Sequence, residues 1–101
     1  MTGLREHRLH IMMSKLAAFE NGGLALSALI PELERLFNAL DLDDPVWREV
    51  FWDSWGELEI NYALALNRGW NSLDEIGEQL VSKAVADLKA VVAEKLSDLT
   101  K

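Results

Sequence analysis

The chain has 101 residues and half of them are apolar, which is enough for one domain with one core and too few for two. Its 17 acidic residues against 10 Lys and Arg give a formal net charge of -7, which disfavours nonspecific binding to nucleic acid or to an anionic membrane. A basic protein is the class of partner that this charge favours. Cysteine is absent, so neither a disulfide framework nor a thiolate metal site is expected.

The N-terminal segment does not have the pattern of a targeting signal. It carries Arg5 and Arg8, but polar residues interrupt its apolar run and no small-residue cleavage site follows. No apolar run in the chain approaches the roughly 18 to 20 residues that a membrane-spanning helix needs. We therefore expect a cytoplasmic protein that has no contact with a membrane.

The first forty residues predict two helices. Between about Leu4 and Glu20, apolar residues recur at intervals of three and four, which is the period of a helix with one buried face. The Asn-Gly-Gly sequence at 21–23 is expected to end this helix. Ser27 is expected to cap a second helix that runs to Leu40, with Pro31 in its first turn.

A third, longer helix is predicted to begin at Asp44 and Pro45. An Asp side chain accepts bonds from the free N–H groups of the first turn, and Pro is suited to the first helical position. The helix is expected to run to Asn67 or Arg68, followed by Gly69 in the left-handed conformation. Its length is unusual for so small a domain.

A fourth helix is predicted from a capping box formed by Ser72 and Glu75, and it is expected to continue to about Leu99. Its apolar positions form a broad face: Leu73, Ile76, Leu80, Val81, Ala84, Val85, Leu88, Val91, Val92, Leu96 and Leu99. No strand pattern of similar strength occurs. We predict an all-α fold, a compact antiparallel bundle of about four helices in one domain over residues 1–101, with the third and fourth helices long.

The third helix has two faces of different character. At about 100° per residue, one sector about 80° wide holds its core positions, which are Trp47, Phe51, Trp55, Leu58, Tyr62 and Ala65. The opposite side mixes apolar and acidic residues: Glu49, Trp52, Asp53, Gly56, Glu57, Ile60 and Ala63. Like charges four residues apart weaken a helix by about 0.2 to 0.5 kcal/mol per pair, so the three carboxylates need a compensating reason.

Two interpretations of this mixed side are open. In one, Gly56 and Ala63 let another helix approach closely, Trp52 packs against that helix, and lysines of the fourth helix neutralise the acids. In the other, Trp52 and its neighbouring carboxylates form an exposed binding patch, because an apolar anchor among polar groups is a common hot-spot arrangement.

Acidic residues are concentrated in the middle of the chain. Between residues 32 and 59 there are nine carboxylates, at positions 32, 34, 41, 43, 44, 49, 53, 57 and 59, against only Arg35 and Arg48. Asp41 and Asp43 could therefore extend the acidic patch of the third helix. This uneven charge could steer a cationic partner to one side of the molecule.

Catalytic and metal-binding patterns are weak. His7 and His10 share a helix face but have no evident third ligand. The acids at 41–44 resemble the start of a calcium loop, but Val46 and Trp52 occupy positions that require Gly and Glu. Glu-x-x-His pairs, a nucleophile elbow and a phosphate-binding glycine loop are missing. We expect no enzyme activity, no cofactor and no direct binding of nucleic acid.

Several motifs, spread over a little over half the chain, match a known family. They are Phe19 with Gly22-Gly23, the Ser27 helix start, Asp44-Pro45-x-Trp47, and Trp55-x-x-Leu58-Glu59-x-x-Tyr62-Ala63-x-Ala65-Leu66. In these motifs the chain resembles the colicin D immunity family, small helical bacterial proteins that accompany secreted or contact-delivered toxins. The resemblance implies an inhibitor that binds one cognate toxin, often a nuclease acting on tRNA.

Our leading hypothesis is an acidic immunity protein that neutralises a cognate toxin, a basic nuclease, by occupying its active site. The expected contact residues are Asp41, Asp43, Glu49, Trp52, Asp53 and Glu57. The alternative is a non-enzymatic oligomerisation or adaptor module that forms a homodimer through Trp52, Ile60, Gly56 and Ala63.

Overall fold

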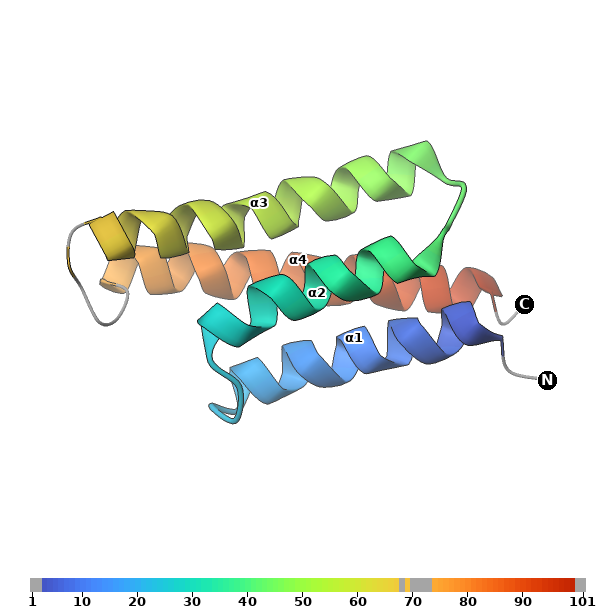
Figure 1. Ribbon diagram of the computed structural model, residues 1–101, viewed down its shortest axis with the longest axis horizontal. Coiled ribbons are helices and arrows are strands. Elements are labelled where there is room, and N and C mark those ends of the chain that lie inside the picture. Colours follow the sequence, from blue (N-terminus) through green and yellow to red (C-terminus); the bar gives the residue numbers. More distant parts are fainter. Residues whose placement is uncertain (1–2, 68, 70–73, 100–101) are drawn as a thin grey trace.

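Four α-helices run antiparallel to one another in chain order around one core (Figure 1). The computed structural model describes residues 3–67, 69 and 74–99. Its helices are α1 (Leu4–Glu20), α2 (Leu26–Leu40), α3 (Pro45–Asn67) and α4 (Glu75–Leu99). The described residues contain no strand. The prediction of an all-α bundle of four helices, the last two long, is confirmed.

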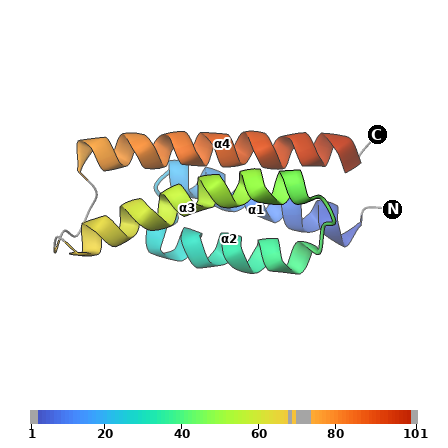
Figure 2. The ribbon, with the colours of Figure 1, turned by 90° about the horizontal axis from the view of Figure 1, so that it is seen from above.

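The helices form a closed ring, in which α1 contacts α2 and α4, and α3 contacts the same two helices. Because α3 and α4 are longer than α1 and α2, the end at which they are connected projects beyond the shorter pair (Figures 1 and 2). The first turns of α4 and the last turns of α3 therefore have no neighbour from α1 or α2. We call this part of the molecule the α3–α4 overhang.

The core is built from apolar residues at three- and four-residue spacing on all four helices. Leu9, Met12 and Leu16 come from α1, and Leu29, Leu33 and Phe37 come from α2. The other pair contributes Phe51 and Leu58 from α3, and Val85, Leu88 and Val92 from α4. Each such side chain stabilises the fold by about 1.5 to 3 kcal/mol relative to an exposed position.

The predicted limits of α3 are confirmed. The Asp44 carboxylate accepts a hydrogen bond from the Trp47 backbone N–H at 3.1 Å, as expected of a cap. After the helix ends at Asn67, Gly69 has φ 71°, a left-handed conformation that favours glycine.

The cap of α4 among the described residues is Asp74. Its carboxylate accepts a hydrogen bond from the Gly77 backbone N–H at 2.7 Å, and the helix begins at Glu75. Ser72, the expected cap, lies outside the described residues.

The predicted start of α2 is wrong. Ala25 is the capping residue, and no side chain caps the helix, which already includes Ser27. The Ala25 carbonyl accepts hydrogen bonds from the backbone N–H groups of Ala28 and Leu29, both at 3.0 Å. This earlier start brings Leu26 against the core, but it places Pro31 inside the helix, beyond the first turn.

Two expected core positions of α4 are exposed. Ile76 is 68% exposed and Leu80 is 43% exposed, whereas the later apolar positions from Val81 to Val92 are largely buried. The reason is the α3–α4 overhang, because α1 and α2 end before they can cover these first turns (Figure 2).

Within the described part of the chain, no helix combines the length and the apolar character that a membrane span requires.

Candidate functional site

The six expected contact residues lie in three different surroundings. Glu49, Asp53 and Glu57 are exposed on successive turns of α3, and we call these three residues the acidic face. Asp41 and Asp43 are exposed at the turn between α2 and α3. The sixth residue, Trp52, is half-buried against α2.

Trp52 belongs to an aromatic cluster rather than standing free among the carboxylates. Its ring centroid lies 4.4 Å from that of Phe37 on α2 and 4.9 Å from that of Trp55 on α3. Such pairs contribute about 0.5 to 1.5 kcal/mol each beyond the apolar area that they bury. The geometry therefore favours the interpretation in which Trp52 packs on another helix, and that helix is α2.

The rest of that interpretation is not supported. No atom lies within 4 Å of the place where a Cβ on Gly56 would stand, and Ala63 is exposed, so neither residue marks a close helix contact. Two other tryptophans of α3 do join the helices. The Trp47 indole N–H donates to the Val91 carbonyl and the Trp55 indole N–H to the Ile30 carbonyl, both at 3.0 Å.

The carboxylates of the acidic face have no ion pair or hydrogen bond with the described residues. The nearest lysine of α4, Lys83, donates instead to Asp87 at 2.8 Å. This hydrogen bond, the charge of Asp87 and the charge of Glu57 raise the pKa of Lys83. The acidic face is therefore only partly offset by the chain's own cations.

A hollow of about 370 Å³ lies between α3 and α4 beside the acidic face. From α3 it is lined by Asp53, Ser54 and Glu57, and from α4 by Leu80, Lys83, Ala84 and Asp87. A second hollow of about 160 Å³ lies further along the same two helices, with Val46 and Val50 on one side and Glu94 and Asp98 on the other.

The two hollows lie along the same side of the α3–α4 pair. Along α4, the residues that line them recur on every turn from Leu80 to Asp98, which is the pattern of a single helix face. The lining residues of α3 from Val46 to Glu57 follow the same rule. We call this feature the α3–α4 groove.

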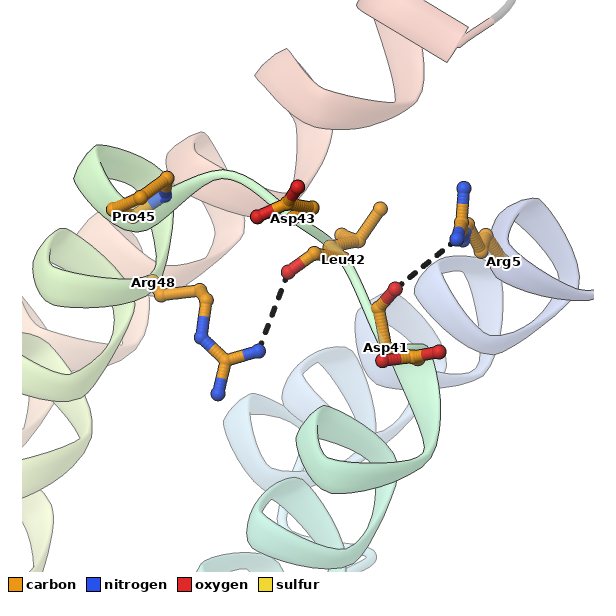
Figure 3. A pocket seen from close by; sticks show the side chains of 6 residues that line it. All are labelled: Arg5, Asp41, Leu42, Asp43, Pro45 and Arg48. Atoms are coloured by element: carbon orange, nitrogen blue, oxygen red, sulfur yellow. Dashed lines mark hydrogen bonds between the residues drawn. The ribbon is translucent and has the colours of Figure 1, made fainter.

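Asp41 and Asp43 line a separate open hollow at the turn between α2 and α3 (Figure 3). Arg5 from α1 donates to the Asp41 carbonyl at 3.1 Å, and Arg48 from α3 donates to the Leu42 carbonyl at 3.2 Å. Arg8 donates to the Ala39 carbonyl at 2.5 Å. Three guanidinium groups thus bind carbonyls at and just beyond the end of α2, where a helix has free acceptors and negative partial charge.

These arginines hold the turn in a defined shape. Asp41 has a left-handed φ of 50°, which an Asp tolerates better than most residues. Asp44 at the end of the turn binds Lys95 at 2.5 Å, and that bond together with the Trp47 N–H lowers the pKa of Asp44. The exposed carboxylates of Asp41 and Asp43 are therefore presented from a fixed backbone.

Sequence reasoning missed the contribution of α4 to this surface. Lys83, Asp87 and Glu94 border the α3–α4 groove, whereas the expected contact residues lie only on α3 and at the turn before it. The available signal was their spacing of four and seven residues, which places the three side chains on one face of a helix. Their pairing with α3 also requires the register of the two helices, which a single sequence does not provide.

The described residues contain no group of three or more His, Asp or Glu placed to hold a metal ion. The charged side chains of the groove are arranged along about five turns of α4, from Leu80 to Asp98, which suits recognition of an extended cationic surface.

Comparison with protein-family models, with curated proteins and with solved structures finds no match to this chain.

Proposed function

We propose that this chain is an immunity protein that binds a cognate bacterial toxin, a basic nuclease, and occludes its active site with the acidic face. The observation that carries the proposal is the row of three exposed carboxylates on successive turns of α3 that lack partners among the described residues. Their mutual repulsion weakens the free protein, by about 0.2 to 0.5 kcal/mol per adjacent pair. A cationic partner would convert this repulsion into attraction.

A nuclease is the kind of partner that fits this surface. Its active site must attract the phosphates of a nucleic acid, so it presents lysine and arginine side chains. Carboxylates on a rigid helix can occupy the same cations and exclude the substrate without any chemical step. The complementary charges would also speed association and help to select the partner. Because the nucleic acid that such a toxin would cleave lies inside the cell, we place the proposed complex in the cytoplasm.

Asp41 and Asp43 extend the proposed contact toward the α2–α3 turn. Eight residues separate Pro45 from Asp53, so the turn lies about 12 Å along the helix axis from the middle of the acidic face. A protein interface of ordinary size spans that distance. Asp41→Gly is a clean probe of this extension, because glycine accepts the left-handed φ of 50° at that position while the carboxylate is lost.

The proposal expects a toxin gene next to the gene for this chain, and the test produces that toxin and this chain in the same cells. The chain is expected to protect the cells and to bind the toxin domain as a one-to-one complex. Charge reversal of Asp53 and Glu57 to Lys should abolish protection. The matched control reverses Glu34 and Glu59, which are equally exposed but lie outside the acidic face, and should preserve it.

Equal loss of protection in both double variants would mean that net charge alone matters and would overturn the acidic face as the contact. Failure of the unaltered chain to bind the neighbouring toxin would reject the immunity function itself.

The second candidate is an oligomerisation or adaptor module, and the observation that favours it is the exposure of Ile60, which is 57% exposed beside the acidic face. Since Trp52 is held by α2, Ile60 is the better position to test. Sedimentation of the unaltered chain and of Ile60→Glu decides between the two candidates, because a dimer that the substitution splits into monomers would support self-association.

A further inference from the structure

The α3–α4 groove is flanked by exposed apolar side chains at both ends. At the overhang, Ile76 and Leu80 lie one turn apart on α4, and Leu64 on α3 is 45% exposed. At the other end, Val46 and Val50 are exposed on α3. Exposed apolar groups at both ends of a groove offer contacts for the apolar face of another helix.

We propose that the α3–α4 groove receives an amphipathic helix of the partner protein that carries lysine or arginine along its flanks. The proposal rests on the proposed function and names the structural element of the partner that the same surface binds. From Leu80 to Asp98 the groove extends along α4 for about 27 Å, so a partner helix of about 18 residues would fill it.

The charges that border the groove select this occupant. Acidic side chains come from both helices, namely Asp53, Glu57, Asp87, Glu94 and Asp98. The two lysines among them are already engaged, because Lys83 binds Asp87 at 2.8 Å and Lys95 binds Asp44 at 2.5 Å. The border is therefore negative, and cations on both flanks of an apolar helix would complement it.

A second copy of the chain is a poor occupant, because its own groove would bring carboxylates against carboxylates. The cations on the described remainder of the surface are largely in use. Three arginines bind carbonyls near the end of α2, Arg35 binds Glu32 at 2.6 Å, and Lys89 binds Glu20 at 2.7 Å. The carboxylates that border the groove would also repel an anionic membrane.

The test titrates the full isotope-labelled chain with a synthetic 18-residue helix of Leu and Lys that has one apolar face, and follows backbone amide signals by NMR. Saturable shifts are expected on α3 and α4, with α1 and α2 little affected. A peptide with the same composition in shuffled order cannot present a single apolar face and is expected to bind more weakly. A matched peptide of Leu and Glu should not bind.

Leu80→Gln separates the groove from simple charge attraction. Because Leu80 is already 43% exposed, the substitution should leave the fold intact, and it should weaken peptide binding by about fivefold or more. Leu4→Gln is the matched control, since Leu4 is 68% exposed on α1, and it should bind the peptide like the unaltered chain.

Equal affinity of Leu80→Gln and Leu4→Gln, or equal affinity for the ordered and shuffled peptides, would overturn the groove proposal. A dimer of the free chain that Leu80→Gln dissociates would also overturn it, in favour of a second copy as the occupant. These measurements use no toxin, so their failure leaves the protection assay with Asp53 and Glu57 to decide the immunity function separately.

Discussion

Lys95 near the end of α4 binds Asp44 at 2.5 Å, so the residue that caps α3 is also tied to the neighbouring helix. The lysine ammonium group lies 5.8 Å from the Trp47 ring, which is buried against α4. The Asp44 carboxylate thus caps the first turn of α3, and its ion pair with Lys95 fixes the position of that turn against α4. This junction lines the second hollow of the α3–α4 groove.

We predict that Asp44→Asn lowers the stability of the fold at neutral pH. Asn still caps a helix, so the loss should come mainly from the ion pair with Lys95. Urea denaturation at pH 7 measures the change in the free energy of unfolding. Asp43→Asn is the control, because Asp43 is exposed at the same turn and should change this free energy little.

The effect of Asp44→Asn should depend on pH in a definite direction. The bonds from Lys95 and the Trp47 N–H hold the pKa of Asp44 below its ordinary value of 3.8. A lowered pKa in the folded state gives stability that is fully present above the unfolded pKa and is lost as the pH falls through the folded pKa. The difference between the unaltered chain and Asp44→Asn should therefore shrink below about pH 4. A difference that stayed constant from pH 7 to pH 2 would contradict the ion pair.

The helix limits were predictable because they depend on short-range signals. The regular apolar spacing from Leu4 to Glu20, the pair Asp44 and Pro45, and Gly69 each act within one or two turns. The start of α2 was not predictable from Ser27, because the need to bring Leu26 against the core outweighed the weaker preference for a hydroxyl cap.

The candidate site was only partly predictable because it depends on how the helices pack against one another. Sorting α3 by angle assumes one buried face, but α3 lies between α2 and α4, so its buried arc is wider. Trp52 on one side of the predicted core sector and Asn61 on the other are therefore covered. Asn61 is 7% exposed, and its side-chain N–H group donates a hydrogen bond to the Glu57 carbonyl at 2.7 Å. The exposure of Ile76 likewise depends on where the two shorter helices end.

Trp52→Ala should destabilise the fold by about 2 to 3 kcal/mol, somewhat less than the loss for a fully buried tryptophan. The reason is the loss of ring contacts with Phe37 and Trp55. Trp52→Phe keeps a ring in that place and should recover most of the stability. Chemical denaturation of both variants measures the difference.

The same two variants separate stability from binding. If Trp52 only packs on α2, Trp52→Phe should protect cells from the toxin as well as the unaltered chain does. Loss of protection in a fully folded Trp52→Phe variant would instead make the indole itself a contact residue.

Arg8→Met should lower the free energy of unfolding by about 1.5 to 3 kcal/mol, the range for a hydrogen bond to a charged group. Arg8 donates to the Ala39 carbonyl in the last turn of α2, and methionine keeps much of its apolar length. Arg35→Met is the control, because Arg35 is exposed and pairs with Glu32 three residues earlier on α2. Equal losses in the two variants would show that the carbonyl contact adds nothing.

Two glycine substitutions should change stability in opposite directions. Gly22 has φ 82° in the turn after α1, so Gly22→Ala should cost about 1 kcal/mol or more through backbone strain. Gly56 lies inside α3 with open space where its Cβ would stand, so Gly56→Ala should stabilise the fold by up to about 1 kcal/mol. Thermal and urea unfolding of the two variants measure these changes. A destabilised Gly56→Ala would mean that another helix approaches α3 closely at that point, as it would in a dimer, and would revive Gly56 as part of a self-association face.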